Sequence, residues 1–238
     1  MSEPSFKGVA IITGAAEGIG RGIALRLVSD GFDVAINDIP AKKSALEQLI
    51  SEITSSTPRR AIAVPGDVSN DGDVKGIVDK AVQELGGLDV MIANAGIAVN
   101  KPIAETTTDE WDRLFAVNVR GTFLCYKHAA DAMIKQGRGG RILGACSIAG
   151  KKGEFDGYQA TKKGLKPGEW TETVRLFLRI MKQLTKVTVW WGQLKSTVAV
   201  GKNGTPTEIA SLVSYLVSKD AHFITGQSII VDGGGIFD

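Results

Sequence analysis

The chain has 238 residues, 43% of them hydrophobic and 23% charged, a composition typical of a soluble globular protein that can bury a sizeable core. A formal net charge of +2 without a block of Lys and Arg argues against a nucleic-acid-binding surface. No apolar run approaches the roughly 18 residues that cross a bilayer, the N-terminus has no signal core, and Cys125 and Cys146 lack metal-ligand spacing, so we expect a cytoplasmic protein without a metal site.

Short apolar runs rich in β-branched residues alternate with longer helical patterns. We expect strands at 9–13, 33–38, 61–68, 88–96, 141–147 and 227–234, and helices from about Gly18, through 41–53, near 70–85 and around 108–136. The repeat of strand, helix and strand indicates βαβ units and a parallel sheet, and uniformly apolar strands are typical of sheets covered on both faces. We therefore predict a single-domain α/β fold over 1–238, a doubly wound parallel sheet of the Rossmann type with about seven strands and helices on both faces.

The segment 163–203 is harder to assign. Pro167 should end or kink the preceding helix near Lys166. A helical stripe then returns, formed by Trp170, Val174, Phe177, Leu178, Met181 and Leu184. The run "KVTVWWG" at 186–192 predicts the next strand.

The sequence "TGAAEGIG" joins the first predicted strand to the first predicted helix. Glycines allow a tight turn there, let the backbone approach a pyrophosphate, and leave amides at a helix N-terminus pointing toward phosphate. The candidate cofactor-binding residues of this turn are Gly14, Glu17, Gly18, Ile19 and Gly20. A purely structural turn between strand and helix is the alternative.

Asp38 ends the second predicted strand, at the spacing expected for an acid that binds a ribose 2′-hydroxyl. Asp38 would repel a 2′-phosphate, and Glu17 would add a second negative charge nearby. The pattern therefore favours NAD over NADP as the cofactor. Asp67, in the "GDV" of Gly66 to Val68, either accepts a hydrogen bond from the adenine amino group or caps the next helix.

Six motifs in order resemble the short-chain dehydrogenase/reductase family. They are "TGAAEGIG", "GDV", "NAG" at Asn94 to Gly96, "NVRGTF" from Asn118, "SIAG" from Ser147 and "YQATK" from Tyr158. The resemblance covers 9 to about 163 and resumes at about 204. The stretch from "DEWDRLF" to "ACSIAGKKG" is most similar to the acetoin/diacetyl reductase and butanediol dehydrogenase group, although sugar and polyol dehydrogenases share much of it.

The resemblance implies a catalytic set of Asn118, Ser147, Tyr158 and Lys162. Tyr158 and Lys162 stand four apart, so they share a helix face, and the ammonium favours the ionised phenol that exchanges a proton with the substrate oxygen. The same resemblance implies that Lys162 binds the nicotinamide ribose, that Tyr158 and Lys162 both belong to the cofactor site, and that Ser147 holds the substrate oxygen.

The resemblance also implies roles for Asn118, for the turn from Asn94 to Gly96 and for Val68. Asn118 is expected to hold a water in line with Lys162, although taken singly it also fits a helix cap. Asn94, Ala95 and Gly96 form a strand-end turn that can pack against the adenosine ribose, and Val68 accompanies Asp67 in the cofactor site.

The chain departs from the family pattern at 163–203, where a Pro-Gly turn and a helical substrate lid are expected. Only 198–205 separates Thr197 from Pro206, which is too short for such a lid. Ser196 or Thr197 is the candidate for contacting the nicotinamide carboxamide. The segment reads as a natural variant, as a splice or frame alteration, or as a stretch of uncertain sequence.

The leading hypothesis is an NAD-dependent oxidoreductase that acts on a small secondary alcohol or ketone, such as a diketone, hydroxyketone, polyol or sugar. The alternative is a catalytically impaired dinucleotide-binding or scaffold protein of the same fold. An epimerase or dehydratase is less favoured, because 238 residues leave no room for an extra substrate domain. By resemblance the expected partners are a small-molecule substrate and further copies of the chain, in a tetramer or dimer.

Overall fold

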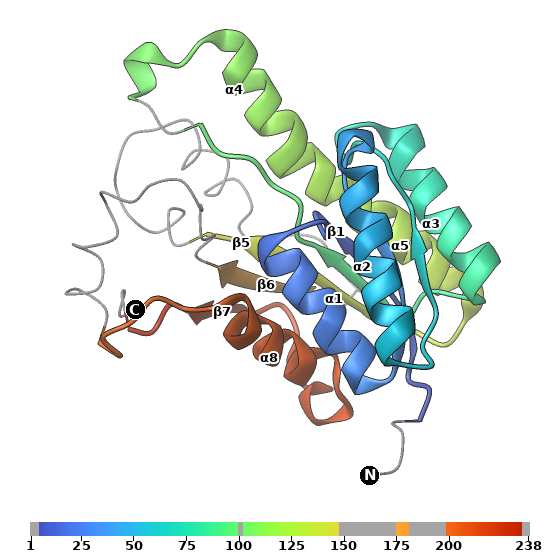
Figure 1. Ribbon diagram of the computed structural model, residues 1–238. Coiled ribbons are helices and arrows are strands. Elements are labelled where there is room, and N and C mark those ends of the chain that lie inside the picture. Colours follow the sequence, from blue (N-terminus) through green and yellow to red (C-terminus); the bar gives the residue numbers. More distant parts are fainter. Residues whose placement is uncertain (1–4, 100–101, 148–174, 181–198, 235–238) are drawn as a thin grey trace.

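The computed structural model describes residues 5–99, 102–147, 175–180 and 199–234, and these build one α/β sheet with helices on both sides (Figure 1). Within this part of the chain the sheet has seven strands in the order β3-β2-β1-β4-β5-β6-β7. The strands are β1 (Gly8–Thr13), β2 (Phe32–Asn37), β3 (Ala61–Ala63), β4 (Val90–Ala93), β5 (Arg141–Cys146), β6 (Arg175–Ile180) and β7 (Ser228–Val231). Every neighbouring pair is parallel, which confirms the predicted doubly wound parallel sheet.

The described helices lie between the strands, as the alternating pattern predicts. They are α1 (Gly18–Asp30), α2 (Lys43–Ser56), α3 (Asp71–Leu85), α4 (Thr108–Phe115), α5 (Thr122–Gln136) and α8 (Pro206–Val217), with a π-helix η3 (Ala116–Gly121) between α4 and α5 and short 3-10 turns η1 (Pro40–Lys42), η2 (Ile103–Glu105) and η5 (Lys219–Ala221). Three of the helices end at a glycine in the left-handed region, at Gly31, Gly86 and Gly137. Only glycine adopts this conformation without strain, so the sequence itself ends these helices.

Two apolar cores cover the two faces of the sheet. Alternate residues of β1 point to opposite faces, so that Ile12 joins the core under α1, α2 and α8, whereas Ile11 joins the core under α3 and α5. Both side chains are fully buried. Figure 1 shows α1 and α8 side by side over one face of the sheet. The uniformly apolar strands are therefore explained by burial on both faces.

The prediction of a helical stripe through Phe177 and Leu178 is wrong. Residues 175–180 form β6, which pairs with β5 from Ile142 to Cys146 and with β7 from Ser228 to Val231. A short apolar run fits the period of a helix and the continuous pattern of a buried strand equally well, so pairing with two neighbouring strands decides its conformation. The predicted strand at 186–192 lies outside the described residues.

The parallel arrangement brings the ends of several strands to one edge of the sheet. The glycine turn follows β1, Asp38 follows β2, Asn94 follows β4 and Ser147 follows β5. In open α/β sheets ligands bind in the crevice outside these carboxyl ends. The fold therefore gathers the residues selected from the sequence along a single edge.

Gly144 allows α5 to pack tightly on β5. A Cβ atom at this position would overlap with the Tyr126 hydroxyl and lie 3.0 Å from Tyr126 Cζ. Tyr126 is buried in the core under α3 and α5, so its ring has little room to move away. A glycine inside a strand commonly marks this kind of close approach.

We predict that Gly144→Ala lowers the free energy of unfolding by about 1–3 kcal/mol, because the added methyl group overpacks the contact with Tyr126. Urea denaturation measures the change. Gly76→Ala is the matched control, since a Cβ atom at this exposed position on α3 meets nothing within 4 Å. The control is expected to leave the free energy of unfolding unchanged or raise it by about 0.5–1 kcal/mol. Equal stability of the two variants would contradict the packing argument.

Candidate functional site

Three positions of the glycine turn after β1 favour glycine, because a side chain there would clash or strain the backbone. Gly14 has φ +64, and a Cβ atom there would lie 2.9 Å from Ala95 Cα. A Cβ atom at Gly20 would overlap with the Gly14 carbonyl oxygen and lie 2.7 Å from Asn94 Nδ2. Gly18 also has a left-handed φ, of +59. These glycines keep the backbone of the turn, rather than side chains, at the carboxyl edge of the sheet.

Hydrogen bonds join this turn to the turn that follows β4. Asn94 Nδ2 donates to the carbonyl oxygens of Thr13, at 2.9 Å, and Gly14, at 3.2 Å. The backbone amides of Asn94 and Ala95 donate in return to Thr13 Oγ1, each at 3.0 Å. Gly96 continues the same half-buried turn. The predicted "NAG" turn is therefore in place, and Thr13 is a structural member of the site that sequence reasoning missed although it opens the glycine motif.

Asp38 lies against the glycine turn. Its Oδ2 accepts from the Ala16 amide at 3.1 Å, and its Oδ1 accepts from the Ile39 amide at 2.9 Å. The Asp38 carbonyl oxygen accepts from the Gly66 amide at 3.0 Å, which connects the end of β2 to the loop after β3. The predicted pairing of a glycine turn with an acid after the second strand is thus found at one place in the structure.

Glu17 is exposed at the start of α1 and forms an ion pair with Lys42 of η1, with Nζ and Oε2 3.2 Å apart. We expect Glu17 to add a second negative charge near a 2′-phosphate, and in the structure Lys42 partly neutralises that charge. Glu17 makes no side-chain cap on α1, so its carboxylate does not occupy the first amides of the helix. Ile19, in the first turn of α1, is buried.

The alternative role of Asp67 as a helix cap is wrong. Asn70 is the N-cap of α3, and its Oδ1 accepts from the Asp73 amide at 3.0 Å. Asp67 instead accepts hydrogen bonds from Ser69 and from Arg113 of α4. Burial raises the pKa of the Asp67 carboxyl, but these hydrogen bonds outweigh the burial, so the pKa lies below its ordinary value. Asp67 is therefore ionised at neutral pH.

Val68 and Asn118 connect the site to the long helices on one face. Val68 is buried, and a Cβ atom at Gly121 in η3 would lie 2.9 Å from Val68 Cγ2. Asn118 is fully buried inside η3, so it does not cap a helix. Asn118 Oδ1 accepts from the Ile97 amide and Nδ2 donates to the Ile97 carbonyl oxygen, both at 2.9 Å. Single π-helical turns occur frequently at functional sites.

Ser147 is buried directly after β5 and next to the buried Cys146. It lies at the carboxyl edge of the sheet, and its place in the catalytic set stays a prediction. Tyr158 and Lys162, and also Ser196 and Thr197, lie outside the described residues. The structure therefore brings Asn118 and Ser147 to the carboxyl side of the sheet and leaves the other half of the predicted catalytic set as a prediction.

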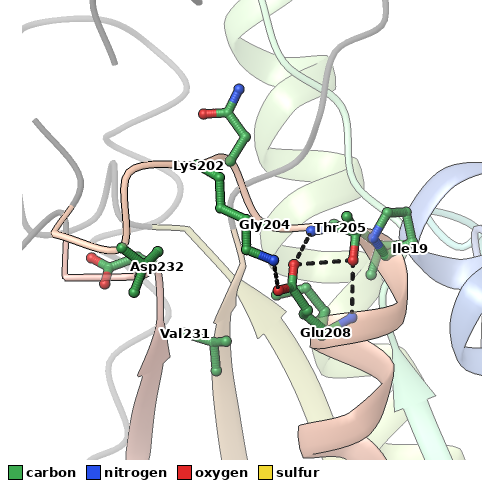
Figure 2. Close-up of a pocket in the computed structure, with 12 residues that line it drawn as sticks. Ile19, Lys202, Gly204, Thr205, Glu208, Val231 and Asp232 are labelled. Atoms are coloured by element: carbon green, nitrogen blue, oxygen red, sulfur yellow. Dashed lines mark hydrogen bonds and ion pairs between the residues drawn. The ribbon is translucent and has the colours of Figure 1, made fainter. Parts of the chain in front are cut away.

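A cavity of about 190 Å³ extends the carboxyl edge toward β7, and Figure 2 shows its lining. Ile19 lines it beside Val231 and the start of α8. Thr205 and Glu208 form a capping box on α8, and Lys202 Nζ donates to Glu208 Oε1 at 2.5 Å. Hydrogen bonds from Lys202 and Thr205 lower the pKa of Glu208 to about 2. Sequence reasoning selected only Ile19 here, although Thr-x-x-Glu with a proline at the first helical position marks the start of α8.

The arrangement has the features of an adenine dinucleotide site. It combines a glycine turn that Cβ atoms would fill, amides at the start of α1, and carboxylates at Asp38 and Asp67. The residues present thus fit a dinucleotide.

Among the described residues no group of three or more His, Cys, Asp or Glu side chains could hold a metal ion. Within the same ranges no helix combines the length and apolar character needed to cross a membrane.

The chain matches known proteins over nearly its whole length. Residues 8–188 match the family described as short chain dehydrogenase, and residues 179–235 match the family described as enoyl-(acyl carrier protein) reductase. A short-chain dehydrogenase/reductase of Hericium erinaceus is 47% identical, over 97% of this chain and 98% of the relative. A diacetyl reductase that forms (S)-acetoin, from Staphylococcus epidermidis, is 36% identical, over 96% and 98%.

Solved structures that resemble the chain contain different nicotinamide cofactors. A blue fluorescent protein from a metagenomic library, in complex with NADPH, has a TM-score of 0.87 and 28% identity, over 97% of this chain and 98% of that protein. A 7α-hydroxysteroid dehydrogenase, in complex with NADH, has a TM-score of 0.89 and 26% identity, over 98% and 96%. With the glycine turn and the "NAG" turn joined at the carboxyl edge, and with these matches covering most of its length, the chain belongs to the short-chain dehydrogenase/reductase family of oxidoreductases.

Proposed function

We propose that the protein is an NAD-dependent oxidoreductase that transfers a hydride between the nicotinamide cofactor and a small secondary alcohol or ketone. The observation that carries the proposal is the glycine turn, which is joined to Asn94 on one side and to the Asp38 carboxylate on the other. This turn offers backbone amides to a pyrophosphate, and Asp38 offers a carboxylate to the adenosine ribose. The dehydrogenases and reductases among the relatives support the reaction class.

The preference for NAD rests on the charge of Asp38. Its carboxylate accepts two backbone amides and has no ion pair to any described residue. A 2′-phosphate on the adenosine ribose would bring like charges close together, whereas a 2′-hydroxyl can donate a hydrogen bond to the carboxylate. Glu17 contributes less than its sequence position suggests, because Lys42 pairs with it.

A bound nicotinamide dinucleotide supplies the hydride-transfer chemistry. Gly14, Gly18, Gly20 and the amides of the glycine turn hold its phosphates in this proposal. Tyr158 exchanges the proton with the substrate oxygen, Lys162 favours the ionised phenol, and Ser147 holds the substrate oxygen. Asn118 shapes the wall of the site through its two hydrogen bonds to Ile97.

A vicinal diketone or hydroxyketone is the substrate class that we favour. The support comes from the relative named as a diacetyl reductase and from another, from Corynebacterium glutamicum, named as an L-2,3-butanediol dehydrogenase. Polyols and sugars stay within the proposal, because they present the same secondary alcohol.

A catalytically impaired dinucleotide-binding protein is the second candidate. The observation that favours it is the position of β6, because only the twelve residues 163–174 lie between Lys162 and the start of this strand. In this candidate the segment 163–203 lacks the helical lid that would hold the substrate. NADH would then bind without hydride transfer to any carbonyl.

Self-association and a cytoplasmic location also remain predictions, as does the reading of 1–238 as a single domain. The homo-oligomer, a tetramer or dimer, is supported by the family resemblance.

We predict that Asp38→Asn shifts the ratio of the NADPH and NADH dissociation constants about tenfold toward NADPH, because it removes one negative charge near a 2′-phosphate and keeps the side-chain shape. Quenching of protein fluorescence by each reduced dinucleotide measures the constants. Asp131→Asn, an exposed residue of α5 that pairs with Lys135, is the charge-matched control. An unchanged ratio in Asp38→Asn, or a wild-type preference for NADPH, would contradict the assignment.

We predict that Tyr158→Phe lowers the kcat for reduction of diacetyl by about 10²- to 10⁴-fold, because the variant loses its general acid. NADH binding should change little. Tyr215→Phe is the matched control, since Tyr215 is an exposed tyrosine on α8. Equal activity of wild type and Tyr158→Phe would eliminate Tyr158 as the acid, and binding of NADH without turnover of diketones, polyols or sugars by the wild type would favour the second candidate.

A further inference from the structure

The loop between β3 and α3 is fixed at its backbone by two neighbouring elements, β2 and α3. Asn37 Nδ2, at the end of β2, donates to the carbonyl oxygens of Val64 and Gly66 at 2.8 and 3.1 Å. The Asp67 amide donates to Asp73 Oδ2 in α3 at 2.8 Å. These bonds fix where the Asp67 backbone lies, and they leave the direction of its carboxylate to side-chain contacts.

Arg113 of α4 supplies those contacts together with Ser69. Arg113 Nη2 donates to Asp67 Oδ2 and Nη1 donates to Ser69 Oγ, both at 2.9 Å. Ser69 Oγ donates onward to Asp67 Oδ1 at 2.7 Å, and the Ser69 amide donates to the same oxygen at 2.9 Å. The guanidinium therefore closes a ring with the hydroxyl and the carboxylate, which holds the plane of the carboxylate in one orientation.

The hydrogen bonds at Asp67 leave one oxygen of its carboxylate, Oδ2, able to accept a further hydrogen bond. A carboxylate offers about four lone-pair positions, two on each oxygen. Within the described residues Oδ1 accepts from two donors of Ser69, whereas Oδ2 accepts only from Arg113. The Asp67 side chain is 32% exposed, so a ligand can reach it. Oδ2 can thus take one more hydrogen bond, and an ionised carboxylate can only accept.

We propose that Arg113 is a positioning residue that aims Oδ2 of Asp67 at the amino group of a 6-aminopurine, so that the site selects adenine over hypoxanthine. The inference rests on the proposed dinucleotide binding. Hypoxanthine carries a carbonyl oxygen where adenine carries its amino group. An ionised carboxylate repels that oxygen and cannot donate to it, and a fixed carboxylate cannot turn away from it.

A purely structural role explains Arg113 less well. The helix that carries it already begins with a capping box between Thr107 and Glu110, and Trp111 and Phe115 pack together with ring centroids 4.8 Å apart. The Arg113 side chain is 48% exposed, and exposed ion pairs contribute little to stability. Its forked contact with both Asp67 and Ser69 therefore matters most for the orientation of the carboxylate.

The test compares the binding of NADH and of reduced nicotinamide hypoxanthine dinucleotide, followed by nicotinamide fluorescence. Wild type should bind the adenine form about tenfold more tightly, and Arg113→Ala should lose about fivefold in affinity for NADH with little change for the hypoxanthine form. Arg113→Lys keeps the charge but cannot fork to two acceptors, so it should show an intermediate preference. In an Asp67→Ala background, Arg113→Ala should have no further effect on the preference.

Arg120→Ala is the matched control, because Arg120 Nε contacts the same loop only through the Ser69 carbonyl oxygen, at 3.2 Å. This control should keep the preference for adenine. An equal loss of affinity for both dinucleotides in Arg113→Ala, or an unchanged preference in Arg113→Ala and Arg113→Lys, overturns the inference while dinucleotide binding stands. Failure of the wild type to bind either dinucleotide overturns both the proposed function and the inference.

Discussion

The contact between the turns after β1 and β4 is the constraint on which the rest of the site depends. Burying a backbone carbonyl group without a hydrogen bond costs free energy. The side-chain amide of Asn94 donates to two such carbonyl groups, those of Thr13 and Gly14. Two turns from different strands can share this amide only if the backbone approaches it closely, which excludes a Cβ atom at Gly20. The amides at the start of α1 are consequently held in position before any ligand binds, as preorganised binding requires.

Local patterns in the sequence predict most of the sheet, whereas pairing between strands decides the rest. Glycine caps, β-branched runs and helical periods are properties of a few neighbouring residues, so β1, α1, β2, α3 and β5 are found close to their predicted places. Residues 175–180 lack such a distinctive pattern, since an apolar run of this length fits a helix or a buried strand. Only pairing with β5 and β7 makes it a strand, and the paired residues are far apart along the chain, as Ile142 with Arg175 and Phe177 with Ser228 show.

The same distinction separates what the sequence predicts of the site from what it cannot. The glycine motif and Asp38 were identified because their spacing along the chain is characteristic. The partners of Asn118 and Asp67 could not be identified, because Ile97 and Arg113 lie 21 and 46 residues away and approach only in the folded chain. Asp67 also resembled a helix cap because Asn70, the actual cap, is three residues further on.

Three carboxylates lie where we propose that the adenosine end of the dinucleotide binds, and they differ in whether a cation compensates their charge. Glu17 pairs with Lys42 and Asp67 pairs with Arg113, so each negative charge lies beside a positive one. Asp38 is held by two backbone amides and pairs with no cation in the described ranges, so less of its charge is compensated. The electrostatic discrimination that we propose against a 2′-phosphate therefore depends mainly on one carboxylate rather than on two. The carboxylates of Glu17 and Asp67 contribute less to this discrimination. At Asp67 we propose that the paired Arg113 instead fixes the direction in which the carboxylate accepts a hydrogen bond.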